Sequence, residues 1–292
     1  MFPSFNARAA GLTLSAVETI DLAASAGFAG VDLLVRDLIL AGDDPKSLRQ
    51  RMDDVGLVGG AFPLPVSWRG DRATYLRDLA ELPRLADIAS ALGLRRTGTW
   101  LLPEVPTGLD RESALEFQLD RVGAIAEILG RNGIRIGLET IGVARSRTGR
   151  TPRLFTRQSD LGPILAALAK AQPNVGQLLD TFHLYAASET LDEALPTGNC
   201  PLVWVHVADL PDDATGDRDE IVDEVRGLPG EHGAVDNVAA LKALADRGYE
   251  GPVTAEPLGQ CRALTGLQPA AAALAIARAL RSVWPIGHPF SP

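Results

Sequence analysis

Hydrophobic and polar positions divide the 292-residue chain into two alternating kinds of segment. Short apolar runs typical of buried strands alternate with longer segments whose apolar residues recur every three or four positions, as on one face of a helix. We expect strands near 2–6, 30–35, 57–62, 95–100, 134–139, 176–180, 202–207 and 252–256. We expect helices between them, at 15–26, 44–55, 71–92, 110–131, 160–172, 189–195, 234–247 and 268–283.

Capping residues mark several of these helix boundaries. Ser15 and Glu18 have the capping-box spacing, and Asp44 followed by Pro45 places a capping side chain before a favoured first-turn proline. A glycine, which tolerates the left-handed turn that ends a helix, separates a predicted helix from the next strand in five places. These glycines are Gly27, Gly56, Gly93, Gly133 and Gly248. The repeating unit is therefore a helix followed by a strand.

Eight such units predict a closed barrel of parallel strands. Strands that alternate with helices pair in parallel through right-handed crossovers. A (β/α)8 TIM barrel takes about 250 residues, so one α/β barrel domain over residues 1–292 fits the length. A doubly wound open sheet is the alternative, but the first strand is followed by FNARAAGL, which lacks the phosphate-binding G-x-G-x-x-G pattern.

Composition narrows the class of partner. A formal net charge of −9 argues against nucleic acid and anionic membranes, because both are bound through clustered positive charge. The longest apolar segment, 269–280, falls short of the roughly 20 residues that span a bilayer. With two cysteines in no ligand spacing and no leader pattern, a cytoplasmic protein acting on a small neutral molecule is expected. Self-association is left open.

Four candidate metal ligands lie at the ends of four consecutive predicted strands: Glu139, Asp180, His206 and Glu256. The carboxyl ends of parallel barrel strands converge on one rim, where barrel enzymes place their chemistry. A single carboxylate at a strand end is more often a helix cap, but four residues at corresponding positions favour a shared site. Three carboxylates and an imidazole suit a divalent ion such as Mn²⁺, Mg²⁺ or Co²⁺.

Further candidates for the site follow the same strands. His183, three residues after Asp180, is either a substrate contact or a buried structural histidine. Asp209 either orients the ring of His206 or is an ordinary loop carboxylate. Trp68 and Trp100, near the ends of the third and fourth strands, either stack on a sugar ring or pack in the core.

Two long loops follow ligand-bearing strands and are expected to overhang the same mouth. Residues 211–233 are acidic and contain glycine. Residues 143–159 carry Arg145, Arg147, Arg150, Arg153 and Arg157. The arginine-rich loop is either a solvated surface, a clamp for an anionic substrate group, or a contact with another subunit.

The series ET, DTFH, HVAD, PGEHGAVD and GYEGPVTAEP, from Glu139 to Pro257, resembles the xylose isomerase-like superfamily of sugar isomerases and epimerases. The resemblance covers nearly the whole chain, although its specific motifs lie in the second half. It implies one metal ion held by the four candidate ligands, and substrate contacts from His183 and an arginine before a Pro-Gly pair. Arg226 has that position, with Arg218 as the alternative, because the segment before Pro229 is longer than usual. An additional residue, His232, lies in the PGEHGAVD turn.

The resemblance implies an isomerase or epimerase that acts on a ketose or related keto-polyol through an enediolate, with Glu139 and Glu256 as acid and base. Mn²⁺ is the first choice of ion, with Mg²⁺, Co²⁺ and Zn²⁺ as alternatives. A lyase or dehydratase acting on a cyclic keto-polyol is the second hypothesis. A non-catalytic sugar-binding barrel is the third, and the presence of all four ligands disfavours it.

Two other members of the superfamily are disfavoured by the histidines. The endonuclease-IV-like repair enzymes need three zinc ions and additional early histidines, and xylose isomerase proper also uses an early-strand histidine. This chain has no histidine before His183. We therefore expect neither DNA repair nor an aldose hydride shift.

Overall fold

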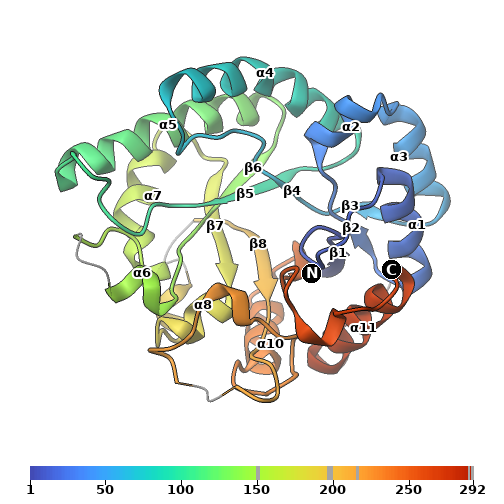
Figure 1. The fold of residues 1–292 in the computed structure, drawn as a ribbon. Coiled ribbons are helices and arrows are strands. Elements are labelled where there is room, and N and C mark those ends of the chain that lie inside the picture. Colours follow the sequence, from blue (N-terminus) through green and yellow to red (C-terminus); the bar gives the residue numbers. More distant parts are fainter. Residues whose placement is uncertain (149–151, 196–199, 215–216, 289, 291–292) are drawn as a thin grey trace.

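The structure is a computed structural model that describes residues 1–148, 152–195, 200–214, 217–288 and 290. Strands lie at its centre and helices surround them (Figure 1). The strands are β1 Phe2–Phe5, β2 Gly30–Val31, β3 Val58–Gly59, β4 Phe62–Pro63, β5 Arg96–Trp100, β6 Arg135–Glu139, β7 Val175–Asp180, β8 Leu202–Val207 and β9 Pro252–Ala255.

The sheet is parallel and closes on itself. Its strand order is β3-β2-β1-β9-β8-β7-β6-β5-β4, so its two outermost strands are β3 and β4. These are the two halves of one run, 58–63, interrupted only by Gly60 and Ala61. Since the backbone continues directly from one edge of the sheet to the other, the nine strands form eight positions of a barrel. The prediction of a TIM barrel is confirmed.

The interruption of the predicted strand 57–62 is caused by a close contact with residues distant in sequence. A Cβ atom at Gly60 would lie 2.1 Å from Asp32 Oδ1 and 2.2 Å from Ser4 Oγ. Asp32, at the end of β2, accepts hydrogen bonds from Ser4 Oγ (2.6 Å), Ala61 N (2.8 Å) and Thr254 Oγ1 (2.8 Å). The chain thus passes over a buried polar cluster inside the barrel, and only glycine leaves room for it.

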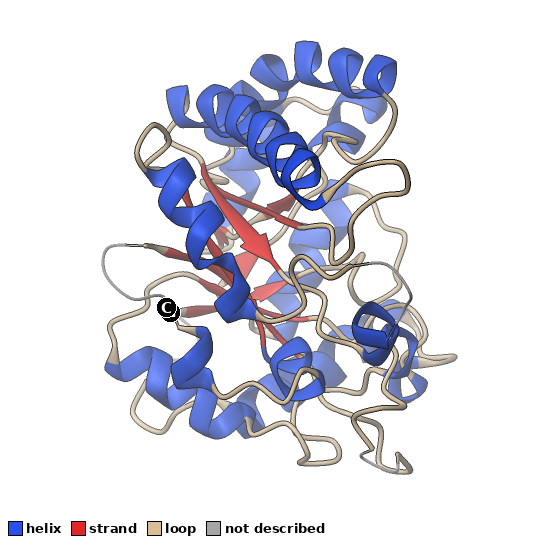
Figure 2. Ribbon diagram, turned by 90° about the vertical axis from the view of Figure 1, so that its left-hand side faces the viewer, coloured by secondary structure: helices blue, strands red, loops and turns tan. Residues whose placement is uncertain are grey.

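Helices cover the outside of the barrel (Figures 1 and 2). Eight correspond to predicted helices: α1 Ala16–Ala26, α3 Pro45–Asp54, α4 Arg72–Ala91, α5 Arg111–Arg131, α7 Gly162–Ala169, α9 Leu191–Ala194, α10 Asn237–Asp246 and α11 Pro269–Val283. Three were not predicted: α2 Val35–Ala41, α6 Ala144–Thr148 and α8 Thr181–Ala186. Short 3-10 turns occur at η1 Gln158–Leu161, η2 Asp223–Val225 and η3 Arg262–Leu264. None of the helices in the described parts of the chain is both long and apolar enough to cross a bilayer.

Side chains fill the barrel interior beneath its carboxyl-terminal rim. Ala61, Leu178 and Trp204 form a small buried cluster there. Gly98 on β5 leaves room for it, since a Cβ atom at this position would lie 2.3 Å from Leu178 Cδ1. Side chains two residues apart on a strand face the same side, so His206 continues the inward-facing row of Trp204 one layer closer to the rim.

Candidate metal centre

The four predicted ligands lie at the carboxyl ends of adjacent strands. Glu139 ends β6, Asp180 ends β7, His206 is near the end of β8, and Glu256 follows β9. Each offers one ligand atom, and these atoms all lie within 4.8 Å of one another. Barrel closure therefore brings together residues that are up to 117 positions apart in sequence, since 256 − 139 = 117. That they share one ion stays a prediction.

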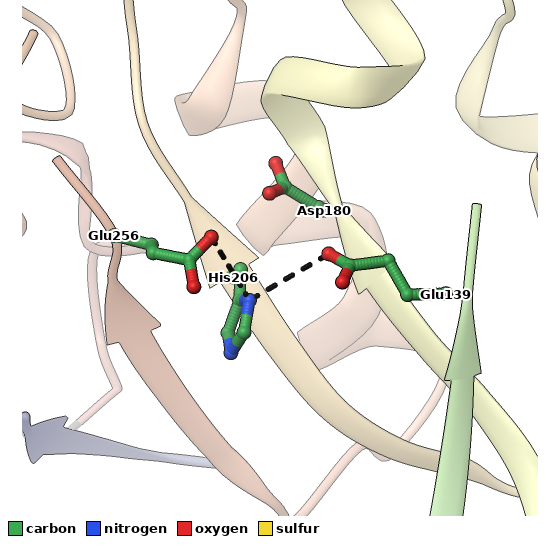
Figure 3. Close-up of side chains that lie close together, drawn as sticks. All are labelled: Glu139, Asp180, His206 and Glu256. Atoms are coloured by element: carbon green, nitrogen blue, oxygen red, sulfur yellow. Dashed lines mark ion pairs between the residues drawn. The ribbon is translucent and has the colours of Figure 1, made fainter. Parts of the chain in front are cut away.

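His206 lies between the two glutamates (Figure 3). Its Nδ1 atom is 3.7 Å from Glu139 Oε1 and 3.4 Å from Glu256 Oε2. Neither ring nitrogen of His206 has a hydrogen-bond partner among the described residues, and the same holds for Glu139 Oε1. Buried polar atoms without hydrogen-bond partners cost free energy. An ion bound between His206 Nδ1 and Glu139 Oε1 would supply the partner that both atoms lack.

Asp180 has two structural roles. Its Oδ1 atom accepts a hydrogen bond from Phe182 N (2.8 Å) at the start of α8, so the side chain caps that helix. Its Oδ2 atom accepts one from Arg226 Nη1 (2.7 Å). Burial opposes ionisation of Asp180, but the adjacent Arg226 guanidinium keeps its pKa below the usual value. The cap and the candidate ligand are therefore one ionised residue.

Arg226 is buried against the ligands rather than at their periphery. Its Nη1 atom is 3.3 Å from Glu256 Oε2, and its Nη2 atom lies 3.1 Å from His183 Nε2 and 2.8 Å from Asp223 Oδ1. The alternative arginine, Arg218, lies over the ring of Tyr185 instead. Of the two candidates the structure brings Arg226 to the site, together with His183; contact of either with a substrate stays a prediction.

The net charge of the site is negative and attracts a cation. The three carboxylate ligands and Asp223 contribute −4 and Arg226 contributes +1, which leaves −3 with neutral His206. Burial raises the pKa of Glu139 and would lower that of His206, but Glu256 and Glu139 raise the pKa of His206 well above its usual value. Without an ion, Glu139 and His206 therefore tend to bind protons, which a bound ion would displace. The buried cluster suggests a divalent metal site, whereas the choice among Mn²⁺, Mg²⁺, Co²⁺ and Zn²⁺ stays a prediction.

The two tryptophans lie in different environments. Trp68 is fully buried, its Nε1 atom donates to Thr99 Oγ1 (3.0 Å), and its ring packs on Phe117. This position suits the packing alternative rather than contact with a substrate. Trp100 is 37% exposed at the end of β5, where it is in register with Glu139 of β6. It remains a candidate wall of the substrate site.

Asp209 does not orient His206. Its carboxylate accepts hydrogen bonds from the backbone N–H groups of Gly233 (2.6 Å), Val235 (3.1 Å) and Leu210 (2.8 Å). It therefore holds the PGEHGAVD turn in place, and His232 in that turn is exposed. The hypothesis that Asp209 orients the ring was wrong because the adjacent turn takes up its oxygens.

Three of the five arginines in loop 143–159 form ion pairs with other segments of this chain. Arg147 pairs with Asp219 (3.5 Å), Arg153 with Glu104 (2.5 Å) and Arg157 with Glu193 (3.5 Å). Arg145 is exposed, and Arg150 lies outside the described residues. These contacts attach the loop to neighbouring elements, a role that none of the three sequence hypotheses included.

Two functional candidates escaped the sequence analysis. Asp223, in the acidic loop, contacts Arg226 and lies 3.6 Å from His183 Nε2. Arg69 follows Trp68 in the loop after β4, and its guanidinium lies 3.7 Å from the Trp100 ring centroid. The position of Arg69 after a strand end was a usable signal, whereas Asp223 is one of several acids in its loop.

Comparison with known proteins identifies the family and agrees with the fold. The chain matches the family described as Xylose isomerase-like TIM barrel over residues 20–283, and it belongs to that family. A xylose isomerase domain protein from Alicyclobacillus acidocaldarius superimposes with a TM-score of 0.82 at 26% identity, covering 97% of this chain and 98% of that one. Sugar epimerases share the fold, among them D-psicose 3-epimerase from Clostridium cellulolyticum (TM-score 0.66, 16% identity, 97% and 99% coverage).

Two curated relatives carry names of different reactions. A 3-dehydroshikimate dehydratase from Pseudomonas putida is 26% identical over 243 residues, which cover 82% of this chain and 35% of the dehydratase. An inosose isomerase from Halalkalibacterium halodurans is 24% identical over 191 residues, which cover 64% of this chain and 61% of the isomerase. The chain thus spans about a third of the dehydratase's length. The proteins to which the chain is similar thus carry the names of an isomerase, an epimerase and a dehydratase.

Proposed function

We propose that the protein is a divalent-metal-dependent isomerase or epimerase that moves a proton at the carbon next to the carbonyl of a ketose or related keto-polyol. The observation that carries this proposal is the convergence of four ligand atoms within 4.8 Å, with Glu139 and Glu256 on either side of His206. Glu139, Asp180, His206 and Glu256 would hold the ion. When bound, it would polarise a carbonyl oxygen and so acidify the adjacent C–H bond.

The two glutamates have the roles of base and acid. Each carboxylate has two oxygens, so one can bind the ion while the other reaches the substrate. One glutamate removes the proton next to the carbonyl to give an enediolate, and the other returns a proton. Return to the opposite face of the same carbon gives epimerisation, and return to the neighbouring carbon gives isomerisation.

His183 and Arg226 orient the substrate in this proposal. The Arg226 guanidinium contacts Asp180, Glu256 and His183 at once, so these groups are held in fixed relation to each other. Positioned N–H donors stabilise negative charge that develops on a substrate oxygen. Trp100 supplies an apolar wall at the rim.

The first test replaces one base. Glu256→Gln keeps an oxygen near the ion and removes the ionisable carboxylate, so metal binding is retained in part while exchange in D₂O falls about 10²- to 10⁴-fold. Deuterium incorporation next to the ketone carbonyl, followed by NMR on the metal-loaded enzyme, measures this. Glu250→Gln is the matched control, because Glu250 is exposed at the other end of β9. Exchange that is unchanged in Glu256→Gln removes its assigned role.

A second candidate function is dehydration of a cyclic keto-polyol, and the relatives named 3-dehydroshikimate dehydratase support it. The same proton removal then expels a β-hydroxyl group instead of being reversed. The two functions are separated by product: an α,β-unsaturated product absorbs in the ultraviolet, whereas an epimer or isomer does not. Incubation with 3-dehydroshikimate and with an inosose, each followed by absorbance and NMR, decides between them.

A further inference from the structure

Arg69 places a guanidinium at the rim beside the proposed metal centre. It lies in the loop between β4 and α4, with its Cζ atom 3.7 Å from the ring centroid of Trp100 and 4.9 Å from that of Trp68. Its Nη1 atom donates to Thr99 Oγ1 (2.9 Å) and to the Trp100 carbonyl oxygen (2.8 Å). These contacts fix it at the end of β5, the strand next to the one that carries Glu139.

Arg69 has no counter-charge of its own. Among the described residues, no carboxylate forms an ion pair with it, and no hydrogen bond involves its Nε or Nη2 atom. Arg226, by contrast, is neutralised by Asp180 and Asp223. Burial lowers the pKa of Arg69 to about 10, and Glu139 is the acid whose charge opposes that shift. The half-buried guanidinium of Arg69 therefore has two unused N–H groups and no carboxylate in direct contact.

The geometry points to a carboxylate on the substrate: we propose that the Nε–Nη2 edge of Arg69 binds the carboxylate of an acidic keto-polyol whose carbonyl faces the metal centre. This inference rests on the function proposed above. The two N–H groups on one edge of a guanidinium match the two oxygens of a carboxylate, and the aromatic contacts hold its plane. A neutral sugar would offer only hydroxyl groups to this edge, whereas a carboxylate would also form an ion pair with the guanidinium.

The competing explanation for Arg69 is that it only holds its loop in place. A different arginine already holds this loop. Arg121 on α5 donates from Nη1 to the carbonyl oxygens of Trp68 and Gly70, the residues on either side of Arg69. The segment is therefore held in place from both flanks. This arrangement makes Arg121 the matched control for any effect that arises from loosening the loop.

Two binding probes that differ by one carboxylate measure how much that group contributes to binding. Catechol and 3,4-dihydroxybenzoate both chelate divalent ions through adjacent oxygens, and only the second carries a carboxylate. We expect calorimetry on the Mn²⁺-loaded protein to show that 3,4-dihydroxybenzoate binds roughly tenfold to hundredfold more tightly. Arg69→Gln should abolish this preference without changing catechol affinity, Arg69→Lys should keep part of it, and Arg121→Gln should keep all of it.

The outcomes separate failure of this inference from failure of the proposed function. Metal content of the protein and deuterium exchange on uncharged ketoses report on the proposed function alone. If the ion and catechol bind but the wild type shows no preference for the carboxylate, the inference is overturned. Retention of the preference in Arg69→Gln, or its equal loss in Arg121→Gln, overturns it too. A protein that binds neither the ion nor catechol fails both proposals together.

Discussion

At the scale of single residues, the site reuses groups that also hold the fold. Asp180 caps α8 through one oxygen and faces Arg226 and the other ligands through the second. Sequence reasoning treated the cap and the ligand as alternatives, because either explains a carboxylate at a strand end. Only the coordinates show that the two oxygens divide the roles. Asp32 likewise makes several contacts at once, since its hydrogen bonds join β1, β2 and β9 beneath the ligands.

Asp32 predicts a specific pH dependence of stability. Burial raises its pKa, against hydrogen bonds from Ser4, Ala61 and Thr254 that lower it. Between the unfolded value of about 3.9 and the raised folded value, the folded state binds more protons, so stability falls as pH rises through this window. Asn does not titrate. Urea unfolding gives the free energy of unfolding of the wild type and of Asp32→Asn at each pH. The wild-type value minus the Asp32→Asn value should decrease as pH rises, by at most about 1.4 kcal/mol per pH unit. A pH-independent difference contradicts this account.

At the scale of elements, periodicity and capping located most helices and strands but missed those without a local signal. The helix α2 begins after Leu34, which makes no side-chain capping bond, so the run from 30 to 35 looked like one strand. The helix α8 begins immediately after β7, with no intervening loop to mark the change. The break between β3 and β4 depends on Asp32 and Ser4, which are distant in sequence from Gly60. Long-range contacts of this kind leave no pattern in a local window.

Gly60 gives the element-scale prediction. Gly60→Ala drives a methyl group into Asp32 and Ser4, and the overpacking should cost about 1–3 kcal/mol or more of unfolding free energy. Gly162→Ala is the matched control, because no atom lies within 4 Å of its Cβ position and its φ of −46° is helical. We expect the control to be neutral or to gain up to about 1 kcal/mol. Urea denaturation of both variants measures the difference, and equal stabilities would refute the tight contact.

At the scale of the whole molecule, barrel closure explains why the clustering of the four candidate ligands could be predicted from the sequence. Parallel strands in sequential order place their carboxyl ends on one rim, so strand-end residues can be assigned to one site without knowing any loop. The same reasoning cannot place Asp209 or Asp223, because loop side chains take positions set by contacts between loops, whereas Arg69 follows a strand end and could have been noticed. A single domain over residues 1–292 and the state of association both stay predictions.

The central claim is that one divalent ion is held by residues from the last four strand positions of the barrel. Anomalous diffraction at the manganese edge from a crystal equilibrated with Mn²⁺ tests it most directly. The account predicts one strong peak at bonding distance, roughly 2.0–2.4 Å, from Glu139, Asp180, His206 and Glu256 together. A crystal with bound Mn²⁺ elsewhere and no peak among these four side chains would contradict it.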